Sequence, residues 1–399
     1  MTPLRIGYTC HDAFPSTHTN TQQIFWTLSE VARLGHQVDL CVPAVHGGAE
    51  ARALIAAHYG APEGLVPDGL RFMPMGQAYS ATAAAKGWFD LRAAWRFNRR
   101  THDVVWTRDP VAFAAALQWR VPVVFETYRP DFASSPSFAP WRAATIGHSR
   151  RMRLIGDTRM AGVITHSALA ARAFIGAGVP ADRVRVAHNG FAPTLMAPVL
   201  TRAQARAATG LPADGPLVIY TGHVGPQKGT DALIALAAAV PEARLVIVGV
   251  DDDSRERRWV LQGAAAAGAN NVVLVPRVGL RDVARFLYAA DCLVIPPTDA
   301  PLARYRHTVL PMKVFSYLAA GRPILAPALP DIEEVLTDDV NAVLVAPGRV
   351  DAQAAALRAL LADTSRANRL AASALESSRT FTWATRAAAI TDVMATWIA

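Results

Sequence analysis

Short apolar runs alternate with longer helical patterns along almost the whole sequence. In the first half, the apolar runs are LRIGY (4–8), QVDLCV (37–42), DVVWT (103–107), VPVVF (121–125), GVIT (162–165) and VRV (184–186). In the second half, they are LVIYT (217–221), RLVIVG (244–249), NVVLV (271–275), DCLVI (291–295) and PILA (323–326). Apolar strands separated by helices are typical of parallel sheets that are covered on both faces. The sequence therefore predicts an α/β protein with doubly wound parallel sheets.

A break in this alternation separates the two halves. The segment 191–200, FAPTLMAPVL, contains two prolines that interrupt the periodicity. The length of 399 residues also exceeds what one hydrophobic core usually spans. We therefore predict two Rossmann-like domains that face each other, with ligands bound in the cleft at the carboxyl ends of the strands.

Composition excludes several other classes of protein. With 52% hydrophobic and 18% charged residues, the chain is neither disordered nor fibrous. Cys10, Cys41 and Cys292 are odd in number and lack a metal-type spacing, which favours a reduced, cytoplasmic protein. No targeting segment is evident, and glycines, asparagines and a proline interrupt the uncharged stretch 259–276. We therefore expect no membrane span.

Positive charge is concentrated in the first half of the chain. Residues 1–195 contain 20 Lys and Arg against 13 Asp and Glu, whereas residues 196–399 contain 20 against 19. An anionic partner is therefore expected to meet the first half. A nucleic acid would suit the isoelectric point of about 9.8. However, the sequence contains no recognised nucleic-acid-binding module, so we expect no such partner.

A glycine-rich loop, YTGHVGPQKG (220–229), follows a predicted strand and precedes a predicted helix. Glycines allow close backbone approach to a ligand, and the helix start offers free N–H groups. Lys228 adds a full charge and is one of only three lysines, with Lys86 and Lys313. This combination favours a diphosphate ligand. The alternative is an ordinary strand–helix loop with a solvated lysine.

The segment 307–326, HTVLPMKVFSYLAAGRPILA, is a second well-bounded pattern. Pro311 suits the first turn of a helix, Phe315 and Leu318 share one face, and Gly321 ends the helix before a strand. Taken alone, this pattern predicts only a packed helix.

Together, these segments resemble glycosyltransferase family 4, the retaining nucleotide-sugar transferases of GT-B fold. The glycine loop resembles the family's G-[R/H]-x-x-x-x-K-G phosphate loop, and residues 307–326 resemble its P-x-K-x-F-E-Y-x-A-A-G-x-P helix. AHNGF (187–191) resembles the family's domain boundary, RLVIVGV (244–250) its central strand, and residues 9–43 its first βα unit. These matches follow the family's order along nearly the whole chain, which is more specific than any single motif.

The resemblance implies roles for residues of the second half. His223 and Lys228, beside Gly222, correspond to the basic positions that neutralise the donor diphosphate. The family's E-x7-E pair corresponds to Thr308 and Ser316, which flank Pro311 and carry no carboxylate. The resemblance places Thr308 by the donor sugar and phosphate, and Ser316 by the ribose. A serine can still form a hydrogen bond, but it lacks the charge and reach of a glutamate.

The resemblance also implies roles in the first half. Asn20 and Thr21 stand where many relatives carry Gly-Gly, and they would offer N–H and side-chain groups to the donor sugar. Glu126 matches the first residue of the family's E-x-H, whereas Tyr128 replaces its histidine. Arg108 resembles the arginine of a Y-x-R that faces the cleft. The alternative for Glu126 and Arg108 is an internal ion pair that orders two loops.

One helical segment mixes aromatic and basic residues. KGWFDLRAAWRFNRR (86–100) places Trp88, Trp95 and Arg99 at helical spacing, with Arg96 beside them. Such a helix suits the anionic inner face of the cell membrane. The alternative is a packed surface helix with core aromatics and solvated arginines.

We therefore expect a retaining transferase that moves a hexose from a nucleoside diphosphate sugar to the hydroxyl of a glycan or lipid-linked acceptor, in the synthesis of cell-surface glycans or glycolipids. The donor would bind the second domain, 196–380, and the acceptor the first, 1–195. The terminal helix, 381–399, resembles one that crosses back onto the first domain.

Neither a cofactor nor a metal is expected, because cationic side chains and helix N-termini can stabilise the leaving diphosphate. The acidic run 251–253 is interpreted as a solvated loop. The main alternative is a catalytically impaired GT-B protein that binds nucleotide sugars, because Thr308 and Ser316 lack carboxylates. A nucleotide-sugar epimerase of the same fold would need acids that this chain lacks at the matched positions.

Overall fold

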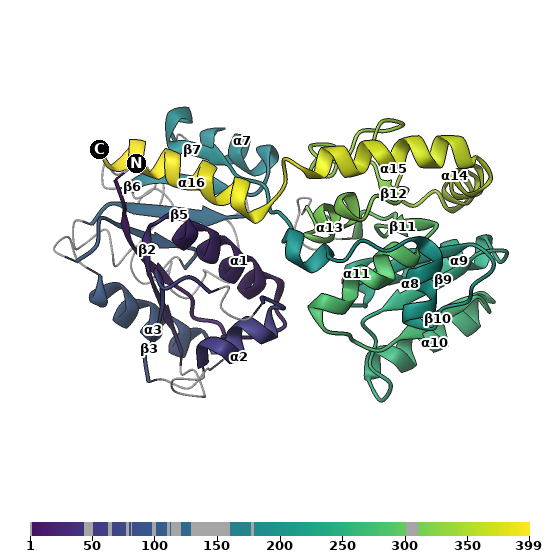
Figure 1. Cartoon of the computed structure of the whole chain (residues 1–399), viewed down its shortest axis with the longest axis horizontal. Coiled ribbons are helices and arrows are strands. Elements are labelled where there is room, and N and C mark those ends of the chain that lie inside the picture. Colours follow the sequence, from purple (N-terminus) through teal and green to yellow (C-terminus); the bar gives the residue numbers. More distant parts are fainter. Residues whose placement is uncertain are drawn as a thin grey trace. The chain divides into compact units, whose positions relative to one another are not determined.

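The chain forms two compact units, Met1–Asn189 with Trp383–Ala399, and Gly190–Thr382 (Figure 1). The computed structural model describes residues 2–43, 51–62, 66–76, 80, 82–97, 101–109, 112, 121–128, 160–176, 179–300 and 310–399. Among these residues, no helix combines the length and the apolar character needed to cross a membrane.

The first unit is built on a parallel sheet of seven strands in the order β3-β2-β1-β4-β5-β6-β7. These strands are β1 (Arg5–Thr9), β2 (Gln37–Val42), β3 (Leu70–Pro74), β4 (Val104–Thr107), β5 (Val123–Thr127), β6 (Met160–Thr165) and β7 (Val184–Val186). The helices described in this unit are α1 (Thr19–Arg33), α2 (Ala51–His58), α3 (Ala83–Arg96), α7 (Ala168–Gly176) and α16 (Trp383–Ile398). The central strands are buried along nearly their whole length, which explains their continuous apolar sequences.

The second unit repeats this plan with a six-stranded parallel sheet in the order β10-β9-β8-β11-β12-β13. Its strands are β8 (Leu217–Thr221), β9 (Arg244–Val248), β10 (Val272–Val275), β11 (Cys292–Val294), β12 (Ile324–Pro327) and β13 (Val343–Val345). The α-helices described in this unit are α8 (Arg202–Thr209), α9 (Thr230–Ala239), α10 (Arg255–Ala267), α11 (Leu280–Ala289), α13 (Lys313–Ala320), α14 (Val350–Ala362) and α15 (Thr364–Ser378).

The strand order reverses once in each sheet. In the first unit β1 lies between β2 and β4, and in the second unit β8 lies between β9 and β11. Loops that leave adjacent strands in opposite directions open a crevice at the carboxyl ends of those strands. The loops after β1 and β4, and the loop after β8, therefore occupy the places where such folds bind ligands.

The last helix, α16, belongs to the first unit although it ends the chain. It packs against α1 and β6, and Figure 1 shows it running alongside α1. Its Trp397 ring covers Gly162 of β6 so closely that a Cβ at that glycine would lie 2.4 Å from the ring. The Trp397 indole N–H donates to the carbonyl of Asp182 at 2.8 Å. A side chain at position 162 would displace this helix.

Candidate functional site

The glycine loop of the second unit connects β8 to α9. It contains a short 3-10 helix, η6 (Pro226–Lys228), and α9 begins two residues later. Gly222 has a φ of 127°, which L side chains rarely adopt. A Cβ at Gly249 would lie 2.9 Å from the Gly222 carbonyl oxygen, so the loops after β8 and β9 meet backbone to backbone. The loop is therefore held in a shape that only glycine permits.

Two of the predicted basic residues lie exposed on this loop. His223 follows Gly222 directly, and its carbonyl accepts a hydrogen bond from the Tyr220 hydroxyl at 2.7 Å. Lys228 ends η6 immediately before the first turn of α9. Within the same loop, the Gly225 N–H donates to the Thr230 hydroxyl at 2.9 Å. The structure therefore places Gly222, His223 and Lys228 on one loop that leads into a helix.

Helix α13 is anchored to the end of β8. The backbone N–H of Thr221 donates to the Tyr317 hydroxyl at 3.0 Å, so this helix meets the strand that leads into the glycine loop. Pro311 precedes the helix, and the Ser316 hydroxyl donates to the carbonyl of Lys313 at 3.0 Å. Thr308 lies outside the described residues.

Lys313, which was not among the predicted site residues, also lies at this loop. Its Nζ lies 3.5 Å from the centroid of the Tyr220 ring, beside the glycine loop. The scarcity of lysine could have singled it out, since Lys313 is one of only three in the chain.

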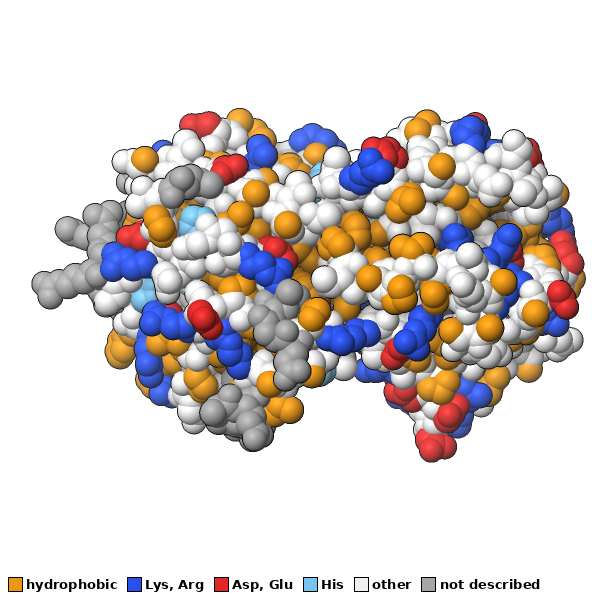
Figure 2. Space-filling model, in the orientation of Figure 1, with side chains coloured by type: hydrophobic (Ala, Val, Ile, Leu, Met, Phe, Trp, Pro, Cys, Tyr) orange, Lys and Arg blue, Asp and Glu red, His pale blue; other side chains and the backbone are white. Residues whose placement is uncertain are grey.

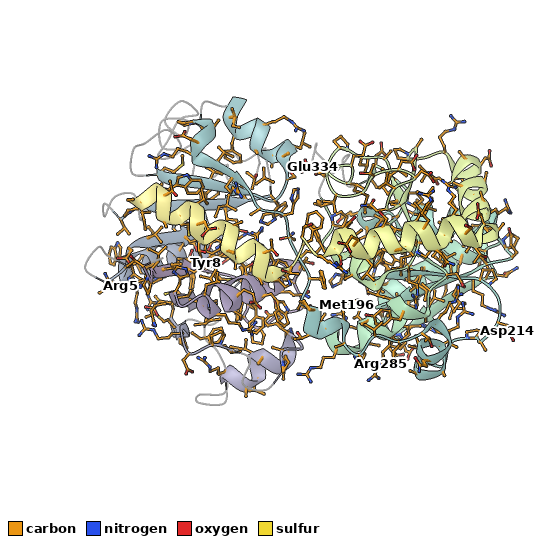
Figure 3. The ribbon with its side chains drawn as sticks, turned by 45° about the horizontal axis from the view of Figure 1, so that its top comes forward. Arg5, Tyr8, Met196, Asp214, Arg285 and Glu334 are labelled. Atoms are coloured by element: carbon orange, nitrogen blue, oxygen red, sulfur yellow. The ribbon has the colours of Figure 1, made fainter. Side chains whose placement is uncertain are left out.

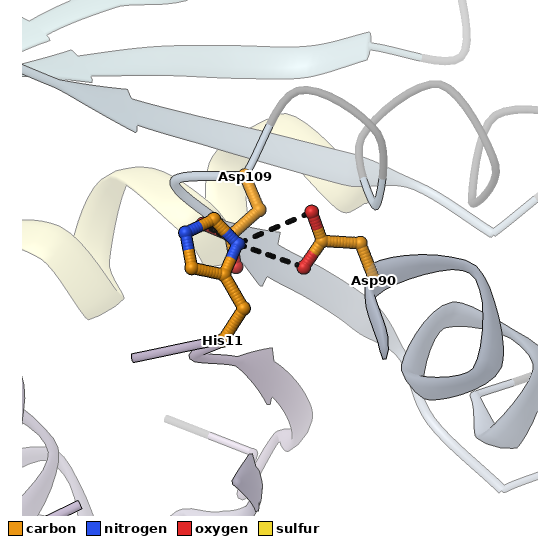
Figure 4. A group of neighbouring side chains, drawn as sticks. All are labelled: His11, Asp90 and Asp109. Atoms are coloured by element: carbon orange, nitrogen blue, oxygen red, sulfur yellow. Dashed lines mark hydrogen bonds and ion pairs between the residues drawn. The ribbon is translucent and has the colours of Figure 1, made fainter. Parts of the chain in front are cut away.

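In the first unit, His11, Asp90 and Asp109 form a compact cluster (Figure 4). His11 follows β1, Asp109 follows β4, and Asp90 reaches the cluster from α3. The His11 Nδ1 atom lies 3.0 Å from Asp90 Oδ1 and 3.2 Å from Asp109 Oδ1. One imidazole therefore bridges two buried carboxylates.

These three side chains strongly perturb one another. Burial lowers the pKa of His11, but Asp109 and Asp90 outweigh it and raise the pKa to about 9. Burial and the neighbouring Asp109 raise the pKa of Asp90 to about 8. The cluster therefore retains protons at neutral pH. Its three ligand atoms, all within 4.8 Å of one another, could also hold a cation in place of those protons.

A second group of polar side chains lies in the loop after β1. Lys86 of α3 and Asn20 of α1 both donate to the Asp12 carboxylate, with Lys86 Nζ 2.8 Å from Asp12 Oδ1. Thr21 is fully buried, and its hydroxyl donates to the His18 carbonyl at 2.9 Å. Asn20 and Thr21, predicted to meet the donor sugar, therefore shape this loop through contacts within the first unit.

Glu126, at the end of β5, occupies the centre of a buried network. Its carboxylate accepts hydrogen bonds from Gln23 at 2.8 Å and from Arg386 of α16. His166 Nε2 lies 2.7 Å from the same carboxylate oxygen. Burial alone would raise the pKa of Glu126, but Arg386 and His166 hold it well below its usual range. The geometry favours the internal ion pair for Glu126, with Arg386 rather than Arg108 as its partner.

Arg108 connects this network to Tyr128. Its guanidinium donates to the side-chain carbonyl of Gln23 and lies 5.6 Å from the centroid of the Tyr128 ring. The hydroxyl of Tyr8, a residue labelled in Figure 3, lies 3.4 Å from Glu126 Oε2, the carboxylate oxygen that Gln23 and Arg386 do not contact. Tyr128 and Arg108 are only partly buried, so they form the accessible end of the network. Sequence reasoning missed Arg386 and His166, which complete it.

Helix α3 presents two different faces. Trp88 and Trp95 are 57% and 66% exposed, whereas Phe89 is only 2% exposed and packs in the core. Arg96 is exposed beside Trp95, and Arg99 lies outside the described residues. Figure 2 shows Lys and Arg side chains gathered at the lower left of the first unit, on the side of α3 and β3. The two tryptophans and Arg96 are therefore surface residues.

Comparison with known proteins gives matches along both units. The family described as "Glycosyl transferase 4-like domain" matches residues 21–190, and "Glycosyl transferases group 1" matches residues 201–377. A D-inositol 3-phosphate glycosyltransferase of Xylanimonas cellulosilytica is 30% identical over 326 residues, which span 78% of this chain and 73% of that protein. A protein of the same description from Stackebrandtia nassauensis is 25% identical, over 82% of this chain and 74% of that protein.

Solved structures show the fold. Sucrose-phosphate synthase from Thermosynechococcus elongatus superposes with a TM-score of 0.75 at 19% identity and covers 98% of both chains. The Anabaena protein HepE, solved in complex with UDP and glucose, gives a TM-score of 0.70 at 18% identity, over 98% of this chain and 99% of that one. These likenesses confirm the predicted GT-B fold.

Proposed function

We infer the reaction from the premise that this chain belongs to the family 4-type glycosyltransferases, as its motifs predicted. We propose that it transfers a hexose from a nucleoside diphosphate sugar to an acceptor hydroxyl with retention of configuration. The observation that carries this proposal is the loop Gly222–Lys228. It combines a close backbone approach, a helix start and a lysine after the strand at the sheet's reversal point.

The donor end is assigned to the second unit. Bond cleavage at the sugar leaves a diphosphate that gains negative charge. The positive end of α9 and the charge of Lys228 would stabilise this charge as it develops. HepE, a structural neighbour, has been solved with UDP and with UDP-glucose, which makes UDP-hexoses the first donors to test. In this proposal, no metal is needed for the leaving group, since fixed cations supply the charge.

The acceptor end is assigned to the first unit. Two relatives are described as D-inositol 3-phosphate glycosyltransferases, a description that names a phosphorylated, and therefore anionic, molecule. The excess positive charge of residues 1–195 would suit such an anionic acceptor, whether a glycan or a lipid-linked one. Arg108 and Tyr128 are the accessible groups of the buried network, and we assign them to the region where the sugar is transferred.

A donor assay tests the proposal. The purified chain would be incubated with UDP-, GDP- and ADP-hexoses, with and without acceptor extracts, and free sugar and nucleotide would be measured. A transferase releases the nucleoside diphosphate, and NMR of the product reports whether the anomeric configuration is retained. Binding of a nucleotide sugar without release would favour the alternative, a catalytically impaired binding protein. No binding to any donor would exclude both.

We also propose that α3 docks the protein on an anionic membrane surface. The exposed Trp88 and Trp95 lie seven residues apart, two helical turns, with the cationic Arg96 beside them. Flotation with vesicles of phosphatidylglycerol or of phosphatidylcholine tests this. The wild type should bind only the anionic vesicles, and W88A/W95A should bind neither. Leu261→Ala, at a 46% exposed leucine of the second unit, is the control. Equal binding by all three proteins would contradict the proposal.

A further inference from the structure

The amino group of Lys313 lies directly on the glycine loop. Lys313 is the first residue of α13, and its Nζ stands 3.5 Å from the centroid of the Tyr220 ring. An ideal Cβ built on Gly222 would lie 3.1 Å from this Nζ. The absence of a side chain at Gly222 therefore leaves the amino group room beside the loop.

Neighbouring side chains do not neutralise Lys313. Within the described residues, its Nζ forms no ion pair or hydrogen bond with a carboxylate. The Tyr220 ring, which the amine faces, carries no formal negative charge and can favour the charged amine only through a cation–π interaction. One turn along α13, Ser316 directs its hydroxyl to the carbonyl of Lys313. A carboxylate at position 316 could pair with Lys313, but a serine cannot.

A second cation lies near Lys313. Burial and the charge of Lys228 lower the pKa of Lys313 well below its ordinary value of 10.5. Among the described residues, the titratable side chains that act on or contact this amine are Lys228 and Tyr220, and Tyr317 lies four residues along the same helix. Burial raises the pKa of both tyrosines, so they stay neutral near pH 8. The glycine loop is thus bordered by Lys228 and by an amine whose charged form is disfavoured by burial and by Lys228, and a bound anion would stabilise that charged form.

We propose that Lys313 is a second cationic contact for the donor diphosphate and that it binds this group from the α13 side while Lys228 binds it from the α9 side. This inference rests on the proposed function, because it takes the glycine loop as the donor site. It predicts a preference for diphosphates, since a ligand with fewer negative charges gains less from two lysines. It also predicts that a bound diphosphate raises the pKa of Lys313, so that any proton gained on binding is taken from solvent.

Calorimetry with UDP, UMP and inorganic pyrophosphate tests the inference. The variant Lys313→Met keeps the length and apolar stem of the side chain but removes its charge. We expect it to bind UDP and pyrophosphate about ten- to a hundredfold more weakly and UMP with a smaller loss. Arg358→Met is the matched control. It also removes one positive charge from the second unit. However, Arg358 pairs with Glu242, which precedes β9 at the amino ends of the strands, whereas the glycine loop lies at their carboxyl ends.

Proton uptake separates a binding role from a merely structural one. Titrations with UDP at several pH values between 7 and 9, each in HEPES and in Tris, which differ in ionisation enthalpy and contain no phosphate, reveal protons taken up on binding. The wild type and Arg358→Met should take up protons, and Lys313→Met should not. Unchanged UDP affinity and unchanged proton uptake in a folded Lys313→Met protein would overturn the inference and leave the proposed function intact. Failure of the wild type to bind UDP, any other nucleoside diphosphate or pyrophosphate would overturn both.

Discussion

Arg386 of the terminal helix donates a hydrogen bond to the carboxylate of Glu126, 260 residues earlier in the chain. Both side chains are almost completely inaccessible to solvent. The same arginine also donates to the backbone carbonyls of Ala187 and His188, where the chain leaves the first unit. One side chain therefore joins the terminal helix, strand β5 and the last segment before the second unit.

Replacing Arg386 should destabilise the first unit. Arg386→Met leaves the Glu126 charge buried without its main partner, which costs about 3–5 kcal/mol of unfolding free energy. The double variant R386M/E126Q removes the stranded charge and should recover part of the loss. Denaturant unfolding of R386M, E126Q and the double variant, followed by the tryptophans of the first unit, measures these changes. If the double variant were as unstable as the sum of the two single variants, the carboxylate and guanidinium would not be coupled.

Stability should fall between pH 6.5 and 9 because of His11 and Asp90. The folded protein keeps the His11 proton up to about pH 9, whereas an unfolded histidine loses it near 6.5. It keeps the Asp90 proton up to about pH 8, whereas an unfolded aspartate is ionised above about 4. The folded state therefore binds more protons than the unfolded state. For each extra bound proton, the free energy of unfolding falls by about 1.4 kcal/mol for every unit by which the pH rises.

Asp90→Asn tests this assignment, because the amide resembles the protonated carboxyl group. Thermal unfolding between pH 7 and 9 should show a flatter pH dependence than in the wild type. The window avoids His166, whose pKa burial lowers to about 4. Parallel pH profiles for the two proteins would place the titrating groups elsewhere.

Lys228→Ala should weaken nucleoside diphosphate binding with little effect on folding. Lys228 is exposed, so the loss of its side chain leaves no cavity. A charge-assisted contact of this kind contributes about 1.5–3 kcal/mol, or roughly ten- to a hundredfold in affinity. Calorimetry with UDP measures the change, and the melting temperature provides the control. An affinity for UDP equal to that of the wild type would show that Lys228 does not contact the diphosphate.

Chelation tests the expected independence from metal ions. If lysines and helix starts alone stabilise the leaving diphosphate, dialysis against EDTA should leave the transfer rate unchanged. A rate lost with EDTA and restored by Mn²⁺ or Mg²⁺ would instead direct attention to the cluster of His11, Asp90 and Asp109. In that case, Asp90→Asn should abolish the restoration.

The parallel α/β fold was readable from the sequence because buried parallel strands are apolar throughout. The run LVIYT, for example, forms β8 with all five residues buried. In contrast, β3 at the sheet edge reads LRFMP, with only Leu70 fully buried, and no apolar run revealed it. An edge strand has a neighbouring strand on one side only, so more of β3 is exposed and its sequence includes the exposed Arg71 and Pro74.

The site was only partly readable for a related reason. The loop 222–228 is continuous in sequence, so its glycines and lysine appear together. Lys313 reaches the loop from a different helix, and Arg386 reaches Glu126 from the end of the chain. Such contacts depend on which elements pack together, and local spacing contains no information about that. The outward orientation of Trp88 and the inward orientation of Asp90, on one helix, likewise required the structure.

Ser316→Glu should change nucleoside and diphosphate binding in opposite directions. A glutamate can accept hydrogen bonds from two ribose hydroxyls, so uridine should bind more tightly if position 316 faces the ribose, as the family resemblance implies. The same carboxylate would stand three residues after Lys313, where it can pair with the ammonium across one helical turn. That pairing would occupy the charge that we assign to the diphosphate, so pyrophosphate should bind more weakly. Calorimetry with uridine, pyrophosphate and UDP separates the two effects, and Ser316→Gln, which is equal in size but uncharged, is the matched control.

Weaker binding of uridine in both variants would mean that neighbouring side chains already fill the pocket. Unchanged pyrophosphate binding in Ser316→Glu would mean that the ammonium of Lys313 does not contact the phosphates.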